Sequence, residues 1–255
     1  MRRNLIILTI LSFVILVGMV QAQGTKDDVH LFQSFFQDAG ITKTLYGEAG
    51  ILYSDYDGFS SMHIPVRGGY PINDQIEANA SIGYLSWSPE EGDGESGLTD
   101  LYVGGRYNIV PEKTKISVGG YATLPIGEEK VDQEHLNFGA FGALRHPLDN
   151  GMVLTGTVGL DFIETTTYER EGWELEEKTE YENAFVLGGG VIYPVNAALH
   201  AVGELVLKTE VDYMALSAGA DYKLTGGNRV RGGLLIGLDD GAPDLGLMAS
   251  FLYFF

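Results

Sequence analysis

Charged and histidine side chains recur at alternate positions of segments that are otherwise apolar or small. Both signs of charge occur, on segments spread along most of the chain. Side chains of this kind that face one enclosed space either line a polar pathway or lock the interior through ion pairs and water, and the sequence is compatible with both. The residues in this register are Glu48, His63, Arg67, Glu77, Asp100, Arg106, Arg145, Asp161, His200, Glu204, Lys208, Asp221 and Arg231.

Asp100 and Arg106 are the first choice within this set for an interior charge network. They carry opposite charges at even positions of one segment, residues 98–110, and therefore share a face of the expected strand. If such a network borders a pathway for ions, replacing Arg106 by alanine is expected to change the conductance.

Two histidines have the neighbours that hydrolytic chemistry would need. Acyl transfer requires a serine within reach of a histidine that a third group orients, and His63 shares its face with Ser61. A histidine beside carboxylates in a loop, such as His135 next to Glu134 and near Asp132, would suit peptide hydrolysis. We interpret these as ordinary interior or loop histidines, so neither a catalytic residue nor an enzyme activity is expected.

The segments that carry these residues alternate apolar side chains with small or polar ones. In residues 116–124, Ile116 and Val118 face one way and Ser117 the other, and residues 136–145 and 152–162 repeat the pattern. An apolar face opposite a polar face, at a period of two residues, is typical of a membrane-spanning barrel with lipid outside and a wetter lumen inside.

The connections between these segments alternate in kind. Short connections rich in Pro, Asn, Asp and Gly occur at residues 70–74, 110–114, 146–151, 193–197 and 225–228. Longer acidic connections occur at residues 88–97, 126–134, 165–182 and 239–244. Outer-membrane barrels show this alternation, because their periplasmic turns are tight whereas their external loops are free to grow.

Twelve strands follow from this segmentation, at residues 44–54, 59–70, 75–87, 98–110, 114–125, 134–146, 152–164, 183–193, 197–208, 211–224, 229–238 and 245–255. The predicted fold is all-β, an antiparallel transmembrane up-and-down β-barrel of about twelve strands over residues 44–255. A ten-stranded barrel is the alternative, because Thr209 and Glu210 leave almost no loop between two strands. A soluble β-sandwich is less favoured, because its outward face would be charged, whereas the corresponding face here consists of Leu, Val, Ile, Phe and Gly.

The first 22 residues predict a secretory signal peptide. Arg2 and Arg3 precede an apolar run over residues 5–17, and small or short side chains follow at residues 20–22, so cleavage is expected after Ala22. A retained membrane anchor is less favoured, because the run falls short of the roughly 20 residues of a spanning helix. No cysteine follows the run, which excludes a lipid-anchored form.

Residues 23–43 would lie on the periplasmic side, between the signal peptide and the barrel. Asp27 or Asp28 could cap a short helix that ends at Gly40, with Val29 and Phe32 on its apolar face. Such a helix would enter the lumen and plug it; a mobile leader and an extra strand segment are the alternatives. The sequence leaves all three open.

The chain ends in a strand with aromatic residues on its lipid face. Phe251, Tyr253 and Phe255 alternate along this strand, and interfacial aromatic residues flank the hydrocarbon region of membrane proteins. A terminal phenylalanine behind alternating apolar residues resembles the signal by which outer-membrane barrels are recognised for assembly. We therefore expect these three residues to be an assembly signal and the barrel-assembly machinery to be a partner.

Composition excludes several classes of protein. The 255-residue chain has no cysteine, and its formal net charge of -19 argues against nucleic acid as a partner. A hydrophobic content of 45% is too high for a disordered acidic chain. We interpret the acidic loops as solvated surface, with divalent ions bridging them to phosphorylated lipopolysaccharide as the functional alternative. No Asp-x-Asp-x-Asp-Gly spacing occurs, so neither a metal site nor a cofactor is expected.

A hairpin over residues 96–127 carries three short motifs: GLTDL at residues 97–101, GRY at 105–107 and LPIG at 124–127. On these motifs the chain resembles an outer-membrane family named for the meta-pathway of phenol degradation, loosely from about Ile82 to the C-terminus. Thr99, where the family usually has glycine, and an unusually acidic long loop depart from the pattern. The resemblance implies a barrel that passes small, often apolar molecules.

These patterns together predict a protein of the outer membrane of a Gram-negative bacterium, in contact with outer-membrane lipid and lipopolysaccharide. The expected function is passage of small solutes, with apolar or aromatic compounds favoured through the resemblance alone. A non-transporting barrel with a structural or surface-interaction role is the alternative, and an outer-membrane hydrolase is less favoured. The sequence names no solute and leaves the oligomeric state open.

Overall fold

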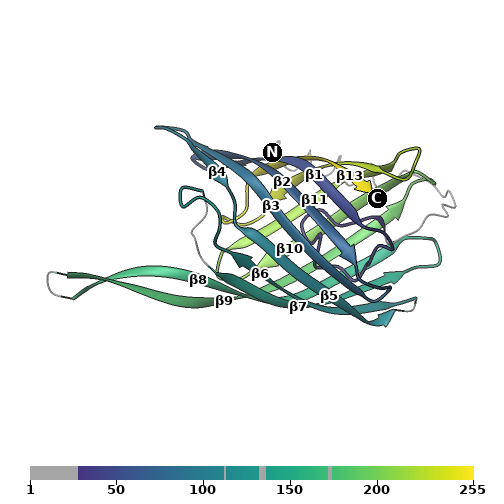
Figure 1. Cartoon of the computed structure of the whole chain (residues 1–255). Coiled ribbons are helices and arrows are strands. Elements are labelled where there is room, and N and C mark those ends of the chain that lie inside the picture. Colours follow the sequence, from purple (N-terminus) through teal and green to yellow (C-terminus); the bar gives the residue numbers. More distant parts are fainter. Residues whose placement is uncertain (1–27, 112, 132–135, 172–173) are drawn as a thin grey trace.

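The computed structural model is a β-barrel with one segment of the chain inside it (Figure 1). The structure describes residues 28–111, 113–131, 136–171 and 174–255, with the backbone alone for residues 166–179. The predicted signal peptide, residues 1–22, lies outside the described residues, as do His135 and its acidic neighbours. Within the described part of the chain, no helix is both long enough and apolar enough to span a membrane.

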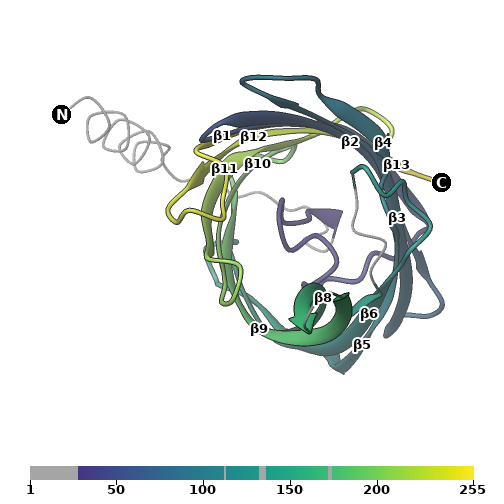
Figure 2. The same cartoon turned by 90° about the vertical axis from the view of Figure 1, so that its left-hand side faces the viewer.

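The described strands form one antiparallel sheet that closes on itself. β1 pairs with β13, with Tyr46 opposite Phe254 and Asp55 opposite Leu245, and this pairing closes the ring seen along the axis in Figure 2. The strands are β1 (Tyr46–Tyr56), β2 (Phe59–Pro71), β3 (Ile76–Pro89), β4 (Glu95–Leu98), β5 (Leu101–Pro111), β6 (Lys115–Leu124), β7 (Asn137–Pro147), β8 (Val153–Glu171), β9 (Glu174–Pro194), β10 (Leu199–Lys208), β11 (Tyr213–Lys223), β12 (Arg229–Gly237) and β13 (Leu245–Phe254). The predicted up-and-down barrel of twelve strands is confirmed, and the short β4 is an addition to it.

β4 arises because the fourth predicted strand, residues 98–110, is interrupted. β4 pairs with the C-terminal part of β3, where Glu95 lies opposite Trp87. β5 pairs with the N-terminal part of β3. At the interruption, the Thr99 hydroxyl accepts the backbone N–H of Gly83 at 2.9 Å. A side-chain acceptor thus satisfies a backbone donor between the two strands.

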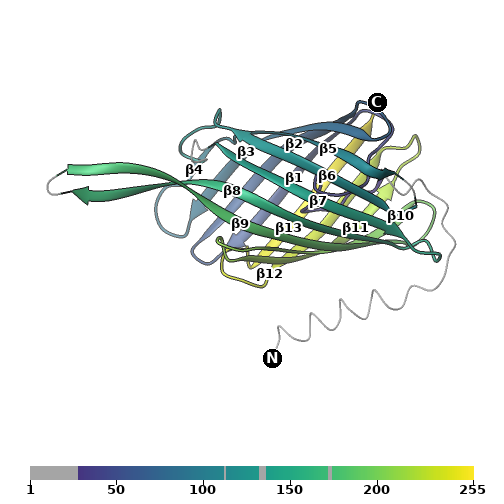
Figure 3. The ribbon, with the colours of Figure 1, turned by 90° about the horizontal axis from the view of Figure 1, so that it is seen from below.

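The longest predicted loop, residues 165–182, is instead the outer part of a hairpin, and its prediction as a loop is wrong. β8 and β9 stay paired from Val153 opposite Ile192 to Glu171 opposite Glu174. The hairpin extends far beyond the rest of the barrel (Figures 1 and 3). Thr and Tyr in this segment favour strand structure. Its charges suggested a loop, but a ribbon outside the membrane needs no apolar face.

The short connections gather at one end of the barrel, which we call the turn end. In the β2–β3 turn, the Asn73 side-chain oxygen accepts the N–H groups of Gln75 at 2.8 Å and Ile76 at 2.9 Å. Asn196 makes the same kind of contact in the β9–β10 turn. These contacts satisfy backbone donors that the ladder leaves unpaired. We call the opposite end, from which the β8–β9 hairpin extends, the loop end.

The connection between β10 and β11, on which the ten-stranded alternative depended, is a tight turn at the loop end. Glu210 and Asp212 have positive φ angles of 64° and 46°. Residues other than glycine seldom adopt this conformation, so the sequence offered no turn signal here. The Thr209 hydroxyl also accepts the Phe185 N–H at 2.9 Å and ties the turn to β9. Both flanking segments are therefore separate strands.

The outward-facing side chains of the barrel are apolar. Val158 of β8 is 59% exposed. In β13, Phe251 and Tyr253 are exposed on the outer face while Leu252 between them is buried. Phe255 follows β13, and its backbone N–H donates to the carbonyl oxygen of Leu45 at 3.0 Å. This is the surface that a barrel presents to hydrocarbon.

Candidate functional site

Residues 28–43, which we call the lumen segment, lie inside the barrel (Figure 2). Val29 and His30 are 0% exposed and Asp38 is 1% exposed. The segment runs as a series of bends without an α-helix, so the helix predicted to end at Gly40 is wrong. Its backbone groups bond to side chains of the surrounding strands, which removes the need for hydrogen bonds within a helix.

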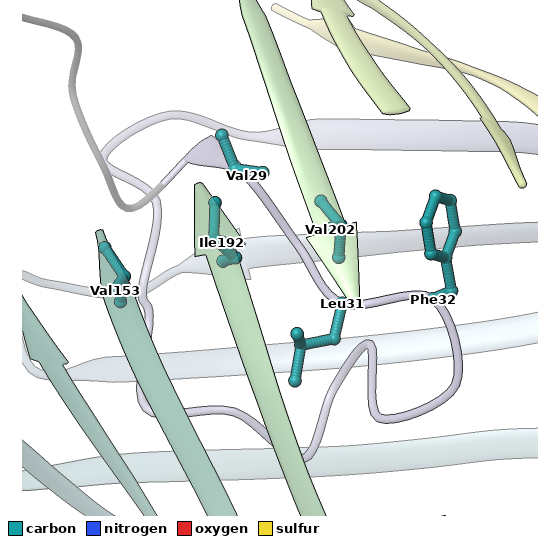
Figure 4. Close-up of a cluster of buried hydrophobic side chains, with 6 residues drawn as sticks. All are labelled: Val29, Leu31, Phe32, Val153, Ile192 and Val202. Atoms are coloured by element: carbon teal, nitrogen blue, oxygen red, sulfur yellow. The ribbon is translucent and has the colours of Figure 1, made fainter. Parts of the chain in front are cut away.

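Apolar side chains of the lumen segment pack against different walls of the barrel. One buried cluster joins Val29, Leu31 and Phe32 to Val153, Ile192 and Val202 of β8, β9 and β10 (Figure 4). A second cluster joins Phe35 and Phe36 to Tyr46 of β1 and Leu252 of β13. The segment is therefore in contact with widely separated strands, and burial of these side chains stabilises its position.

Arginines of the barrel wall donate to carbonyl groups of the lumen segment, and Arg231 and Arg145 are two of them. Arg231 of β12 donates from Nη2 to the carbonyl oxygen of His30 at 2.6 Å. Arg145 of β7 donates from Nη2 to the carbonyl oxygen of Val29 at 3.1 Å, and its Nη1 forms an ion pair with Asp38. Each bond gives a buried carbonyl the partner that it would otherwise lack.

Glu204 of β10 binds the donors of the same segment. Its Oε2 accepts the backbone N–H groups of Phe32 at 3.1 Å and Gln33 at 2.8 Å, and its Oε1 accepts that of Ser34 at 2.8 Å. The Glu204 side chain is almost fully buried. Successive backbone N–H groups around one carboxylate form an anion-binding arrangement. The barrel wall thus offers a carboxylate to the segment's N–H donors and guanidinium groups to its carbonyl acceptors.

An ion-pair cluster connects β1, β2, β11 and β12. Arg231 Nη1 donates to both oxygens of Glu48, at 2.9 and 3.1 Å, and Arg67 Nε donates to Glu48 Oε2 at 3.0 Å. Asp221 pairs with Arg231 at 3.2 Å and also with Arg229. Four predicted residues meet here. Arg229 was missed, although it shares the period of two with Arg231, because it begins its strand directly after a glycine turn.

Asp100 and Arg106 do not form the predicted network. Six positions separate them, which is about 20 Å along extended chain. Arg106 pairs with Glu77 at 2.8 Å and donates to the carbonyl oxygen of Asp38 at 2.8 Å. Asp100 accepts the backbone N–H of Gly127 at 2.9 Å. The prediction is wrong because the expected strand is interrupted between β4 and β5. The interruption directs Asp100 toward the connection that follows β6.

Asp161 and Lys208 form a separate pair nearer the loop end. Lys208 Nζ donates to Asp161 Oδ2 at 3.0 Å, and the Tyr121 hydroxyl donates to Asp161 Oδ1 at 2.5 Å. The Lys208 side chain stays 34% exposed. Asp161 thus links β8 to β10 through Lys208 and to β6 through Tyr121.

The two predicted interior histidines have different surroundings. His200 is buried, and its Nδ1 lies 3.2 Å from Nη2 of Arg229. His63 on β2 is half-buried and borders a cavity. Ser61 is two positions away on the same face of β2. A third histidine, His146, lies at the turn end, where its Nδ1 is hydrogen-bonded to Thr114 Oγ1 at 2.7 Å.

The lumen segment leaves two adjoining cavities. The larger, of about 590 Å³, reaches toward the loop end, where Lys208 and Tyr213 flank the β10–β11 turn. The smaller, of about 180 Å³, lies against β1 and β2, where Gly50 and Pro65 present little side-chain bulk. Residues that line both cavities are Phe32, Leu52, Arg67, Ser81 and Met248. The interior is therefore only partly filled.

Comparison with known proteins gives a family and a fold. The profile of a family described as "Putative MetA-pathway of phenol degradation" matches residues 20–253. No curated protein matches the chain.

Solved structures that are similar to the chain include an outer membrane channel, a toluene transporter and a porin. The COG4313 outer membrane channel from Pseudomonas putida F1 has a TM-score of 0.67 at 12% identity, over 86% of this chain and 98% of that chain. The Ralstonia pickettii toluene transporter TbuX has a TM-score of 0.51 at 9% identity, over 87% and 93%. The KdgM porin in complex with disordered oligogalacturonate has a TM-score of 0.52 at 10% identity, over 82% and 99%. At these identities the likeness is one of fold.

Proposed function

Because the chain belongs to the family described as "Putative MetA-pathway of phenol degradation", we propose that it passes small solutes across the outer membrane of a Gram-negative bacterium. One observation carries the proposal: a closed barrel with an apolar outer face keeps a cavity of about 590 Å³ inside. Twelve strands lie between the eight that side chains fill and the sixteen or more that leave a wide channel. The turn end faces the periplasm and the loop end faces outward, as in other barrels of this kind.

The lumen segment makes this a gated barrel. Side chains from β5, β7, β10 and β12 hold it in place, so it occupies space that a solute would need. Large solutes pass only when the segment is displaced, and small ones use the space beside it. This role was one of three left open for residues 23–43 and is now the one we propose.

The solutes are small apolar or aromatic compounds. Aromatic and aliphatic side chains make up much of the lining of the larger cavity, among them Phe36, Leu52, Tyr102 and Tyr213. Polar side chains such as Gln33, Ser34 and Lys208 lie among them, and apolar linings that carry some polar groups are typical of sites for small organic molecules. The fold shared with a toluene transporter agrees with this class of solute.

The membrane environment supplies the other partners. Outer-membrane lipid contacts the exposed apolar side chains of the strands, and lipopolysaccharide surrounds the loop end. Phe251, Tyr253 and Phe255 form the signal that the barrel-assembly machinery recognises.

Conductance in planar bilayers tests the proposal. The conductance of the intact protein, purified from outer membranes, is compared with that of a variant that lacks residues 23–40. The variant keeps the signal peptide and its cleavage site. We expect small or infrequent currents from the intact protein and larger ones from the variant, and faster entry of phenol into variant-containing vesicles. If neither form conducts or admits solute, the barrel does not transport.

A surface-interaction role is the second candidate. The β8–β9 hairpin projects far beyond the barrel, and residues 164–182 are strongly acidic (Figure 3). Removing residues 166–179 separates the two functions. Loss of adhesion to a surface or cell with unchanged conductance would favour this role.

A further inference from the structure

Arg67 differs from the other arginines of the ion-pair cluster in its exposure. The Arg67 side chain is 19% exposed, whereas those of Arg229 and Arg231 are at most 1% exposed. Within the described residues, its one hydrogen bond runs from Nε to Glu48. The N–H groups on Nη1 and Nη2 are therefore available to another acceptor.

The Arg67 guanidinium is also held in a fixed orientation. Its central carbon lies 3.6 Å from the centroid of the Phe35 ring, so one face of the guanidinium is covered by the lumen segment. The bond to Glu48 fixes the Nε edge. The edge formed by Nη1 and Nη2 is the part that can meet a ligand, and Arg67 lines both cavities. A guanidinium held in this way loses little entropy when it binds a planar anion.

The local charge favours an anion of charge minus one. The cluster contains three guanidinium groups, of Arg67, Arg229 and Arg231, and two carboxylates, of Glu48 and Asp221. One positive charge is therefore in excess. Lys208, the other charged residue that lines the larger cavity, is paired with Asp161. A monoanion at Arg67 would leave the cluster balanced.

We propose that Arg67 binds the carboxylate of a small monocarboxylic acid whose apolar, preferably aromatic, body lies in the larger cavity. Phe32, Leu52 and Met248 line both cavities beside Arg67 and provide the apolar wall for that body. The volume of about 590 Å³ lies within the range of about 300–1,000 Å³ found for small-molecule sites. The guanidinium fork matches the two oxygens of a carboxylate. This inference rests on the proposed function and names a class of solute for it.

Equilibrium binding of benzoate and of benzyl alcohol tests the proposal. The two probes share an aromatic ring, but benzyl alcohol has no charge. Calorimetry uses the protein purified from outer membranes in detergent, as wild type, Arg67→Gln and Arg67→Lys. Lys113→Gln removes the same charge from an exposed side chain at the turn end, where Lys113 pairs with Asp149, and is the matched control.

We expect wild type to bind benzoate more tightly than benzyl alcohol, and R67Q to weaken benzoate binding at least tenfold without affecting benzyl alcohol. R67K keeps the charge but loses the fork, so a smaller loss is expected, and K113Q should match wild type. Heat-modifiable gel mobility verifies folding of each variant; if R67Q does not fold, R67K decides. Equal benzoate affinity in wild type and the Arg67 variants, or no benzoate binding to wild type, overturns the proposal.

Solute entry into vesicles separates this inference from the proposed function. Entry of phenol, with benzoate binding unaffected by R67Q, keeps the proposed function and refutes the role of Arg67. Arg67-dependent benzoate binding without entry of any solute supports the site and refutes transport.

Discussion

The carboxylate of Glu204 accepts the backbone N–H of Ser34 at 2.8 Å, across 170 positions of the sequence. The same carboxylate binds the N–H groups of Phe32 and Gln33. One side chain of β10 therefore holds three consecutive donors of the lumen segment, and its charge is central to the position of that segment.

Replacing Glu204 by glutamine should release the lumen segment more often. The amide has one acceptor oxygen and presents an NH₂ group to backbone donors, and hydrogen bonds to a charged group contribute about 1.5–3 kcal/mol. We expect docking of the segment to weaken by about 2 kcal/mol, seen as a higher open probability in single-channel recordings. Glu210→Gln, in the exposed β10–β11 turn, is the matched control. Recordings from the Glu204 variant that equal wild type would rule out this latch.

Replacing Arg106 by alanine should destabilise the whole barrel as well as change its conductance. The side chains of Arg106 and Glu77, which form an ion pair, are both fully buried. Removing one partner of a buried ion pair lowers the free energy of unfolding by about 3–5 kcal/mol. The urea midpoint for loss of heat-modifiable mobility measures this effect. The double variant Arg106→Met/Glu77→Gln, which leaves no unpaired charge, should be more stable than the single variant. A single variant as stable as wild type would contradict the structure.

Acid should loosen the lumen segment through His30. Burial, followed by the charges of Arg106, Arg231, Arg145 and Arg67, holds the pKa of His30 well below its usual value of 6.5. A released segment has the ordinary pKa, so release takes up a proton. Docking is then unaffected by His30 above about pH 6.5 and weakens as the pH falls below it.

Single-channel recordings at pH 7 and pH 5 measure this dependence on wild type and His30→Phe. Phenylalanine keeps the stacking on Phe35, whose ring centroid lies 4.4 Å from that of His30, and cannot be protonated. Neither ring nitrogen of His30 has a hydrogen-bond partner within the described residues, so no bond is lost. Open probability should rise at pH 5 in wild type and rise less in the variant. An identical rise in both would assign the effect to other groups.

Deleting Phe255 should impair assembly of the barrel more than its stability. The side chain is 72% exposed and lies against Tyr253, with 4.8 Å between ring centroids, so it contributes little to packing. We expect the amount of heat-modifiable barrel in outer membranes to fall severalfold. Phe185→Ala removes another exposed aromatic ring from the outer face and should leave that amount nearly unchanged. Normal yield after the deletion would argue against an assembly signal.

The strands and their faces could be predicted because they depend on local pattern. The alternation of Ile116, Ser117 and Val118 specifies which side chains meet lipid, and turns such as that at Asn73 carry their own sequence signal. Where local signals conflict, prediction failed: charges in residues 165–182 suggested a loop, and a helical spacing in residues 28–40 suggested a helix.

The sequence by itself determined the up-and-down barrel and the alternation of the two faces along its strands, because a period of two residues separates the faces of a strand. Only the tertiary structure decided which interior charges meet. Arg231 reaches Glu48 over 183 positions and Arg145 reaches Asp38 over 107. Such partners depend on the closure of β1 on β13, on strand register and on a segment that enters the lumen. None of these is encoded in the spacing of neighbouring residues.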